Sequence, residues 1–160
     1  MTDKLLQPLS DKVIKDVRSL IADARHAALA VLEQHSGHPA VSRTAIATLA
    51  NGKPVLLTSA LAPHTSALKA DGRCSLLIGE IGKGDPMAHP RLTLFCMAAG
   101  VPHSAEEALR KRFLTHHPKA VNYIDLPDFG FWQLDILRVS YNAGFGKAYG
   151  FDGDVLITQN

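Results

Sequence analysis

The sequence has no long hydrophobic run: its longest apolar stretches, such as Ala27 to Leu32, contain only six residues. A membrane-spanning helix needs about 20. Residues Met1 to Lys12 also lack the apolar core of a secretion signal. We therefore predict a cytoplasmic protein with no membrane partner.

An excess of either charge is also missing, because 17 Lys and Arg residues balance 15 Asp and Glu residues to give a net charge of +2. Such a small net charge produces no field strong enough to attract nucleic acid non-specifically, so we predict no nucleic-acid partner. Cysteine is scarce as well. Only Cys74 and Cys96 occur, both in apolar surroundings, and we predict that they are reduced core residues and not a disulfide.

Several motifs of common enzyme classes are absent. The glycine-rich segment around Gly82-Lys83 does not match a phosphate-binding loop. Leu77 stands where that loop needs its first glycine, and Gly84 stands where it needs a hydroxyl residue. No dinucleotide fingerprint opens a helix after a strand, and no G-x-S-x-G marks a hydrolase nucleophile. The eight histidines show no zinc-like spacing, so we predict no metal site.

The residues that are present predict one folded domain over residues 1–160, with 46% apolar and 20% charged residues. Apolar residues at helical spacing after Ser10 or Asp11 predict a helix within residues 1–24. The apolar segment His26 to Leu32 predicts a buried strand, with a continued helix as the alternative.

Alternating or continuous apolar segments and turn signals predict the remaining elements. Strands are expected at Ala40 to Leu49, Val55 to Ser59, Arg73 to Glu80, Arg91 to Ala99, Trp132 to Ile136 and Val155 to Thr158. A helix is expected at His64 to Ala70. A second helix should begin at a capping box formed by Ser104 and Glu107 and run to about Thr115, and a short third one should begin at Pro118. Five to seven antiparallel strands with inserted helices favour an α+β barrel or open sheet over a βαβ succession.

One charged residue interrupts an apolar strand face. Arg43 shares its face with Val41 and Ala45, and a cation there is costly unless it is paired or reaches the surface. An anionic ligand would pair it, and hydroxyls near the end of the next strand, with His64 at an expected helix start, supply further groups that bind phosphate. In the alternative interpretation, Arg43 extends to the surface and the hydroxyls merely suit strands and caps.

Six short strings carry a resemblance to a known family. They are Ser42-Arg43-Thr44-Ala45, the run from Leu57 to Thr65, Leu68-Lys69-Ala70-Asp71, Cys74-Ser75-Leu76-Leu77, Lys83-Gly84-Asp85-Pro86 and Ala88-His89-Pro90-Arg91-Leu92-Thr93. The chain resembles the pyridoxamine 5′-phosphate oxidase-related FMN-binding proteins, and within them the branch of HugZ-type haem-utilisation proteins. The match covers roughly Ala24 to Tyr149, and the block from Lys83 to Thr93 is its most specific part.

The resemblance implies an antiparallel split β-barrel with peripheral helices, forming a homodimer with FMN at the subunit interface. It places nine residues at the cofactor: Arg43, Thr44, Ala45, Thr58, Ser59, His64, Thr65, Arg91 and Trp132. It implies a flavin-dependent oxidoreductase acting on a small-molecule ligand, and the alternative is a haem-binding or haem-utilisation protein without turnover. Related sequences often carry asparagine near Ala67, so this chain departs from the pattern there.

Overall fold

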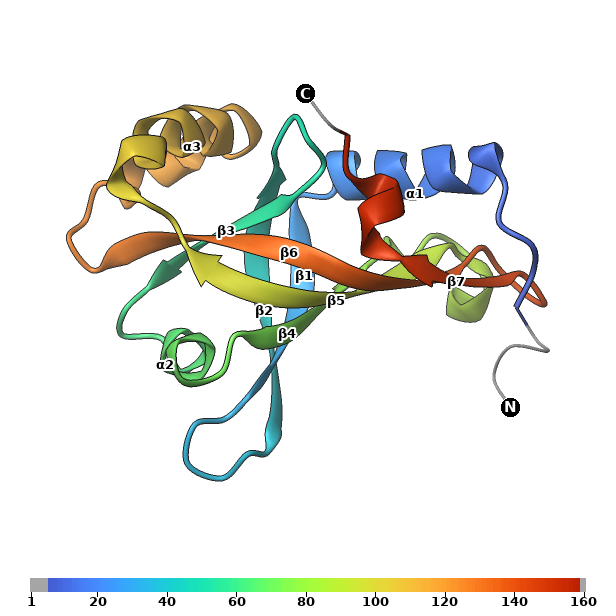
Figure 1. The fold of residues 1–160 in the computed structure, drawn as a ribbon, viewed down its shortest axis with the longest axis horizontal. Helices are drawn as coiled ribbons and strands as arrows, with labels where there is room; N and C mark the ends of the chain where they lie inside the picture. Colours follow the sequence, from blue (N-terminus) through green and yellow to red (C-terminus); the bar gives the residue numbers. More distant parts are fainter. Residues whose placement is uncertain (1–5, 159–160) are drawn as a thin grey trace.

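The fold is taken from a computed structural model, which describes residues 6–158. These residues form seven strands and three α-helices (Figure 1). The strands are β1 (His26–Leu32), β2 (Pro39–Thr48), β3 (Pro54–Ser59), β4 (Arg73–Ile78), β5 (Arg91–Gly100), β6 (Phe129–Asn142) and β7 (Ala148–Asp152). The helices are α1 (Asp11–Asp23), α2 (Pro63–Ala70) and α3 (His103–His116), with short 3₁₀ segments η2 (Pro86–Ala88), η3 (Pro118–Asn122) and η4 (Gly153–Leu156).

The strands form an antiparallel sheet in the order β3-β2-β1-β4-β5-β6-β7, and an additional pairing of β3 with β6 closes the first six into a barrel. Closure pairs β3 with β6 but leaves β2 and β3 unpaired with each other beyond Ile46 and Leu56. The predicted α+β class with an antiparallel barrel is therefore confirmed. Because His26–Leu32 pairs with both β2 and β4, the alternative of a continued helix there is wrong.

Helix α1 forms as its sequence predicts. The Ser10 hydroxyl accepts a hydrogen bond from the backbone N–H of Val13 at 3.4 Å, which caps the helix. Val13, Val17 and Ile21 are buried in the barrel core. Within residues 6–158, no helix is long and apolar enough to cross a membrane.

Two groups of buried apolar residues stabilise the fold. The larger one fills the barrel and is sealed by α1 and α2. The smaller one packs α3 and η3 against β2 and β3, and it contains Phe113 of α3, Ala47 of β2 and Leu57 of β3. Cys74 and Cys96 lie opposite each other on β4 and β5, and both are buried and free, as predicted.

Two predicted elements differ from the structure. Val155–Thr158 is not a strand, because the chain turns into η4, and the last strand is instead β7, which pairs with β6. A Cβ on Gly153 would lie 2.0 Å from the carbonyl oxygen of Ile136. This close approach, which only glycine permits, seats η4 against β6.

The predicted capping box at Ser104 and Glu107 is also wrong. Helix α3 begins at His103 behind Pro102, and no side chain caps its first turn. His103 Nδ1 lies 3.0 Å from a carboxylate oxygen of Glu106 instead. Proline suits a helix start because it constrains the backbone and lacks an N–H, so this helix starts without the hydroxyl cap.

Candidate functional site

The candidate site lies where β2 and β3 separate. The recorded pairs between these strands run only from Thr48 opposite Pro54 to Ile46 opposite Leu56. The remainder of β2 pairs with β1 alone. Helix α2 follows β3 and packs against β1. Its first turn lies beside the free edge of β2, because His64 contacts Ser42 there. Seven of the nine expected cofactor residues lie on the elements that flank this opening: Arg43, Thr44 and Ala45 on β2, Thr58 and Ser59 at the end of β3, and His64 and Thr65 in the first turn of α2.

A network of hydrogen bonds joins Thr58, Thr65 and Trp132. The hydroxyls of Thr58 and Thr65 lie 2.9 Å apart, and Thr65 Oγ1 is 2.6 Å from the carbonyl oxygen of Ser59. Trp132 Nε1 donates to Thr58 Oγ1 at 3.1 Å. A hydroxyl has one proton, so Thr65 donates to the carbonyl and Thr58 donates to Thr65. Both threonines are 3% exposed, and their hydroxyl protons are already used within the protein.

Ser59 is likewise engaged by a protein partner. Its hydroxyl donates to Asp128 Oδ2 at 2.6 Å and accepts from the backbone N–H of Leu61 at 3.1 Å. A carboxylate next to this hydroxyl repels a phosphate group. The sequence prediction missed Asp128, because it lies 69 residues from Ser59 in the chain and no local pattern links them.

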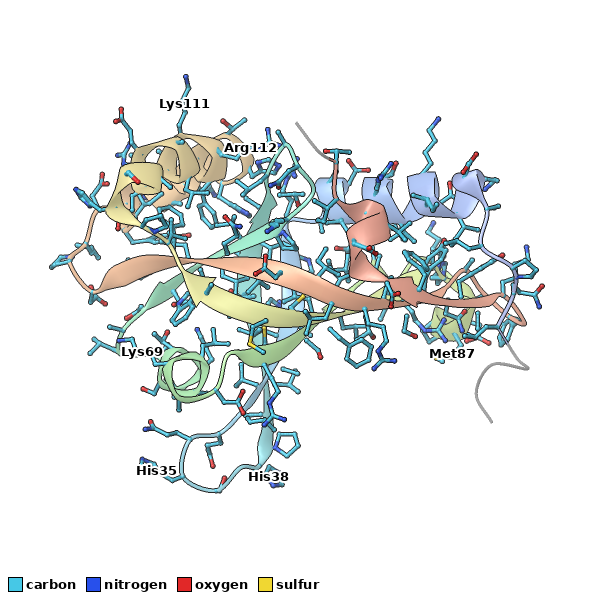
Figure 2. All side chains as sticks on the ribbon, viewed as in Figure 1. His35, His38, Lys69, Met87, Lys111 and Arg112 are labelled. Atoms are coloured by element: carbon cyan, nitrogen blue, oxygen red, sulfur yellow. The ribbon has the colours of Figure 1, made fainter. Side chains whose placement is uncertain are left out.

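A cavity of about 280 Å³ adjoins the network. Thr58, Thr65 and Trp132 line it together with Phe131 and Lys69. Lys69, labelled on α2 in Figure 2, is a cation that the sequence prediction left out of the site. Its spacing of four from Thr65 on one helix was the signal that would have found it.

His64 lies on the other side of the opening. Its Nδ1 is 3.3 Å from the hydroxyl of Ser42 on β2. It lines a cavity of about 240 Å³ that Val31, Ala40 and Ala67 also border. Partial burial lowers the pKa of His64 below its ordinary value, because desolvation disfavours the charged imidazolium.

Arg43 reaches solvent from the outward face of β2. It is exposed, and no hydrogen bond or ion pair holds its guanidinium within the described residues. Its neighbours in the strand differ in burial, since Thr44 is buried and Ala45 is half-buried. Arg43 and Val41 lie on the same face of β2, as predicted. Because Val41 is 68% exposed, apolar residues of a single chain do not enclose the Arg43 guanidinium.

Arg91 lies elsewhere in a single chain. It pairs with Asn142 at one end of the β5–β6 ladder, whereas Trp132 pairs with Gly100 at the other. These ends are roughly 30 Å apart at strand geometry. Its guanidinium donates to the carbonyl oxygens of Met87 and His89 at 2.9 and 3.2 Å, which supports the loop before β5.

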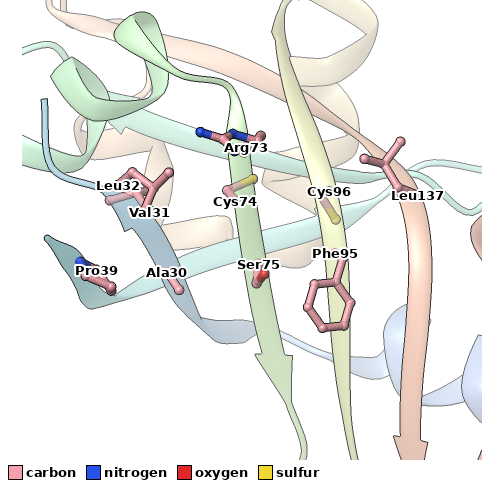
Figure 3. Close-up of a pocket in the computed structure, with 10 residues that line it drawn as sticks. All are labelled: Ala30, Val31, Leu32, Pro39, Arg73, Cys74, Ser75, Phe95, Cys96 and Leu137. Carbon is pink, nitrogen blue, oxygen red and sulfur yellow. The ribbon is translucent and has the colours of Figure 1, made fainter. Parts of the chain in front are cut away.

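The outward face of the sheet carries small and apolar residues beyond Arg43. Arg43 lies opposite Ala28, and Ala28 lies opposite Leu77, which is 50% exposed. A pocket of about 320 Å³ lies further along the same strands. Figure 3 shows Ala30, Ser75 and Phe95 in a row across β1, β4 and β5. No element formed by residues 6–158 covers this face.

These features define a closed antiparallel barrel whose one open strand pair gathers polar and cationic side chains, as in small-molecule-binding barrels. The family model described as CREG, beta-barrel matches residues 8–154. The chain therefore belongs to the CREG β-barrel family.

Two relatives match nearly the whole chain. The chloroplastic heme oxygenase HOZ from Arabidopsis thaliana is 31% identical over an alignment of 159 positions that covers 94% of this chain and 48% of HOZ. The solved structure of a heme binding protein from Mycobacterium smegmatis is 29% identical, with a TM-score of 0.84 over 93% of this chain and 61% of that chain. This chain thus spans about half the length of one relative and three fifths of the other.

A second solved structure bears on the fold alone. It is a protein of the pyridoxinephosphate oxidase family from Clostridium acetobutylicum, related to general stress protein 26. It is 16% identical with a TM-score of 0.71, covering 92% of this chain and 99% of that chain. The expected likeness to pyridoxamine 5′-phosphate oxidase-like barrels and to haem-utilisation proteins is confirmed.

Proposed function

We propose that this protein binds haem at the opening between β2 and α2. Haem is a flat apolar ring with two carboxylates on one edge. The observation that carries the proposal is Arg43, an exposed guanidinium held by no described residue, beside exposed Val41 and Leu77. A guanidinium binds carboxylates in a charge-assisted, bidentate geometry. Val41 also lines the cavity beside α2, so the ring would find apolar contact at the free edge of β2.

The hydroxyl network favours haem over FMN as the ligand. The resemblance would use Thr58, Ser59 and Thr65 to bind a phosphate, yet their protons are donated to protein acceptors and Ser59 contacts the Asp128 carboxylate. FMN binding requires these bonds to be exchanged, which costs free energy. Haem places no phosphate there. Both well-matched relatives carry haem in their names, which supports the same choice.

FMN is the second candidate, in a flavin-dependent oxidoreductase. The cavity beside Thr58 supports it, because Lys69 supplies a cation and Phe131 and Trp132 supply aromatic surface. Bound flavin would provide the redox chemistry, while the protein would position it.

We expect the assembly to be a homodimer that covers the outward sheet face. Val41, Leu77 and Leu137 are 68%, 50% and 55% exposed on strands of that face, and burying them against a second copy would remove this apolar area from water. Val41→Asp would place a charge in that contact. Size-exclusion chromatography with light scattering should show a dimer for the wild type and a monomer for the variant, and a monomeric wild type contradicts the expectation.

The test of the function is a spectroscopic titration of the purified protein with haemin and, separately, with FMN. Saturable formation of a Soret band at one haemin per chain or per dimer supports the proposal. Flavin bound to the protein as purified, with no haemin binding, would favour the second candidate.

Arg43→Ala tests the residue that carries the proposal. Losing one charge-assisted contact should weaken haemin by about 10- to 150-fold, equivalent to about 1.5–3 kcal/mol. Lys111→Ala is the matched control: it removes one positive charge from α3, where Figure 2 shows Lys111 extending away from the barrel. Equal affinities of the two variants would mean that Arg43 does not contact the ligand.

A further inference from the structure

His64 combines three features that together suit a ligand to iron. Its ring is half-buried, and its Nδ1 contacts the Ser42 hydroxyl at 3.3 Å. No described residue makes a hydrogen bond to its Nε2. The cavity that it lines is bordered mainly by apolar groups, including Val31, Ala40 and Pro63. An imidazole that is held through one nitrogen and open at the other has the usual arrangement of a metal-binding histidine.

Ala67 makes the wall of this cavity apolar. It is 2% exposed and lies one turn after His64 on α2. The methyl group offers no hydrogen bond to a polar cofactor tail, whereas it packs well against a porphyrin ring. The departure at Ala67 from related sequences is therefore consistent with an apolar ligand next to His64.

The other histidines lack this combination in the part of the chain that the structure describes. His89 Nε2 lies 2.9 Å from the Lys83 carbonyl oxygen, and His117 Nε2 lies 2.7 Å from that of Ile46. Ring nitrogens of the next three contact a carboxylate or a carbonyl oxygen: His26 with Glu80, His103 with Glu106 and His116 with Arg112. His35 and His38 are exposed at the β1–β2 hairpin (Figure 2).

We propose that His64 Nε2 is the protein ligand to the haem iron and that Ser42 positions its ring. This inference rests on the haem-binding function proposed above. It differs from what the resemblance implies for His64, which is a contact to phosphate. The contact of Nδ1 with Ser42 and the mainly apolar lining of the cavity support the difference, because they leave Nε2 for the iron and offer no further cation to a phosphate.

The experiment compares the haemin complexes of the wild type, His64→Ala and His38→Ala by absorption, EPR and resonance Raman spectroscopy. The wild type and His38→Ala should share an iron–histidine signature and one affinity. His64→Ala should lose that signature, bind haemin more than about 10-fold more weakly, and regain the signature when free imidazole is added. Ser42→Ala should keep the signature but shift the iron–nitrogen stretch and bind up to about 10-fold more weakly.

The outcomes separate this inference from the function on which it rests. An unchanged iron–histidine signature in His64→Ala overturns the assignment of His64, while haem binding itself stands. A wild type that binds no haemin overturns the function. Thermal melting of each variant without haemin shows whether that variant is folded. His64→Met is a second probe. If it is folded, its haemin complex should show the spectrum of a thioether ligand in place of the histidine spectrum.

Discussion

Thr58 is the central acceptor of the hydrogen-bond network at the opening, and Thr58→Val removes only its hydroxyl. Thr58 accepts from Trp132 Nε1 and is paired with the Thr65 hydroxyl. Valine fills the same volume, so no cavity forms. The indole N–H loses its acceptor, which costs about 1–3 kcal/mol when the donor is buried. Because Trp132 is only half-buried, we expect about 1–2 kcal/mol.

Urea unfolding measures this loss, and thermal melting should show a decrease in Tm of about 2–8 °C. Thr115→Val is the control: its exposed hydroxyl donates to the Lys111 carbonyl oxygen within α3, and its effect should stay within about 0.5 kcal/mol. The physical cause is tested by Trp132→Phe, which removes the N–H. In that background Thr58→Val should cost less by at least about 0.5 kcal/mol. A Thr58→Val effect equal to the control's, or one unchanged by Trp132→Phe, would refute the reasoning.

Three further predictions concern the scaffold. Gly153→Ala places a Cβ 2.0 Å from a backbone oxygen and should lower the free energy of unfolding by about 1–3 kcal/mol or more. At Gly130 a Cβ would have no neighbour within 4 Å, so Gly130→Ala should not lower the free energy of unfolding in this way. Urea unfolding of the two variants tests the difference. Hydrogen bonds from Arg73 lower the pKa of Asp71 to about 2, so its stabilising effect is present above pH 4 and is lost as the pH falls towards 2. NMR titration should find that pKa, and Arg73→Gln should return it towards 3.8. Burial raises the pKa of Cys74 to about 11, so iodoacetamide at pH 8 should alkylate its thiol only after unfolding in urea.

Local patterns were sufficient for the elements whose signals are local. The spacing of Val13, Val17 and Ile21 and the Ser10 cap predicted α1, and Asn51-Gly52 predicted the β2–β3 turn, where Gly52 has a φ of +94°. Such features depend on residues a few positions apart. Barrel closure depends on β3 pairing with β6, which no local pattern specifies, and the expectation of a closed barrel came from the resemblance.

The predicted strand at Val155 to Thr158 failed for the same physical reason. A four-residue apolar segment suits a strand or a turn of helix equally well. The missed strand β7 contains glycine and aromatic residues, and its position is fixed by the hairpin that it forms with β6: Tyr149 stacks on Tyr141 with ring centroids 5.8 Å apart. Only the partner strand makes β7 a strand.

The side-chain contacts of the candidate site could likewise not be predicted from local sequence patterns. The sequence and the resemblance grouped Thr58, Thr65 and Trp132, and the structure brings them into hydrogen-bond contact. Neither source indicated that the hydroxyls would be satisfied by each other and by a carbonyl group. Arg91 was grouped with them by the same resemblance, yet in one chain it lies at the far end of β5, so any contact with a shared ligand requires the second copy that we expect.

The geometry of β2 constrains how one ligand can use both Arg43 and His64. Ser42 and Arg43 are adjacent in a strand, so their side chains point to opposite faces. Ser42 contacts His64 on the side covered by α2, and Arg43 points to the outward face. A ligand held by both residues would therefore have to reach around the free edge of β2, with His64 holding the iron and Arg43 a carboxylate. Loss of Arg43 should then weaken haemin without changing the iron spectrum, and loss of His64 should change the spectrum while the carboxylate contact persists.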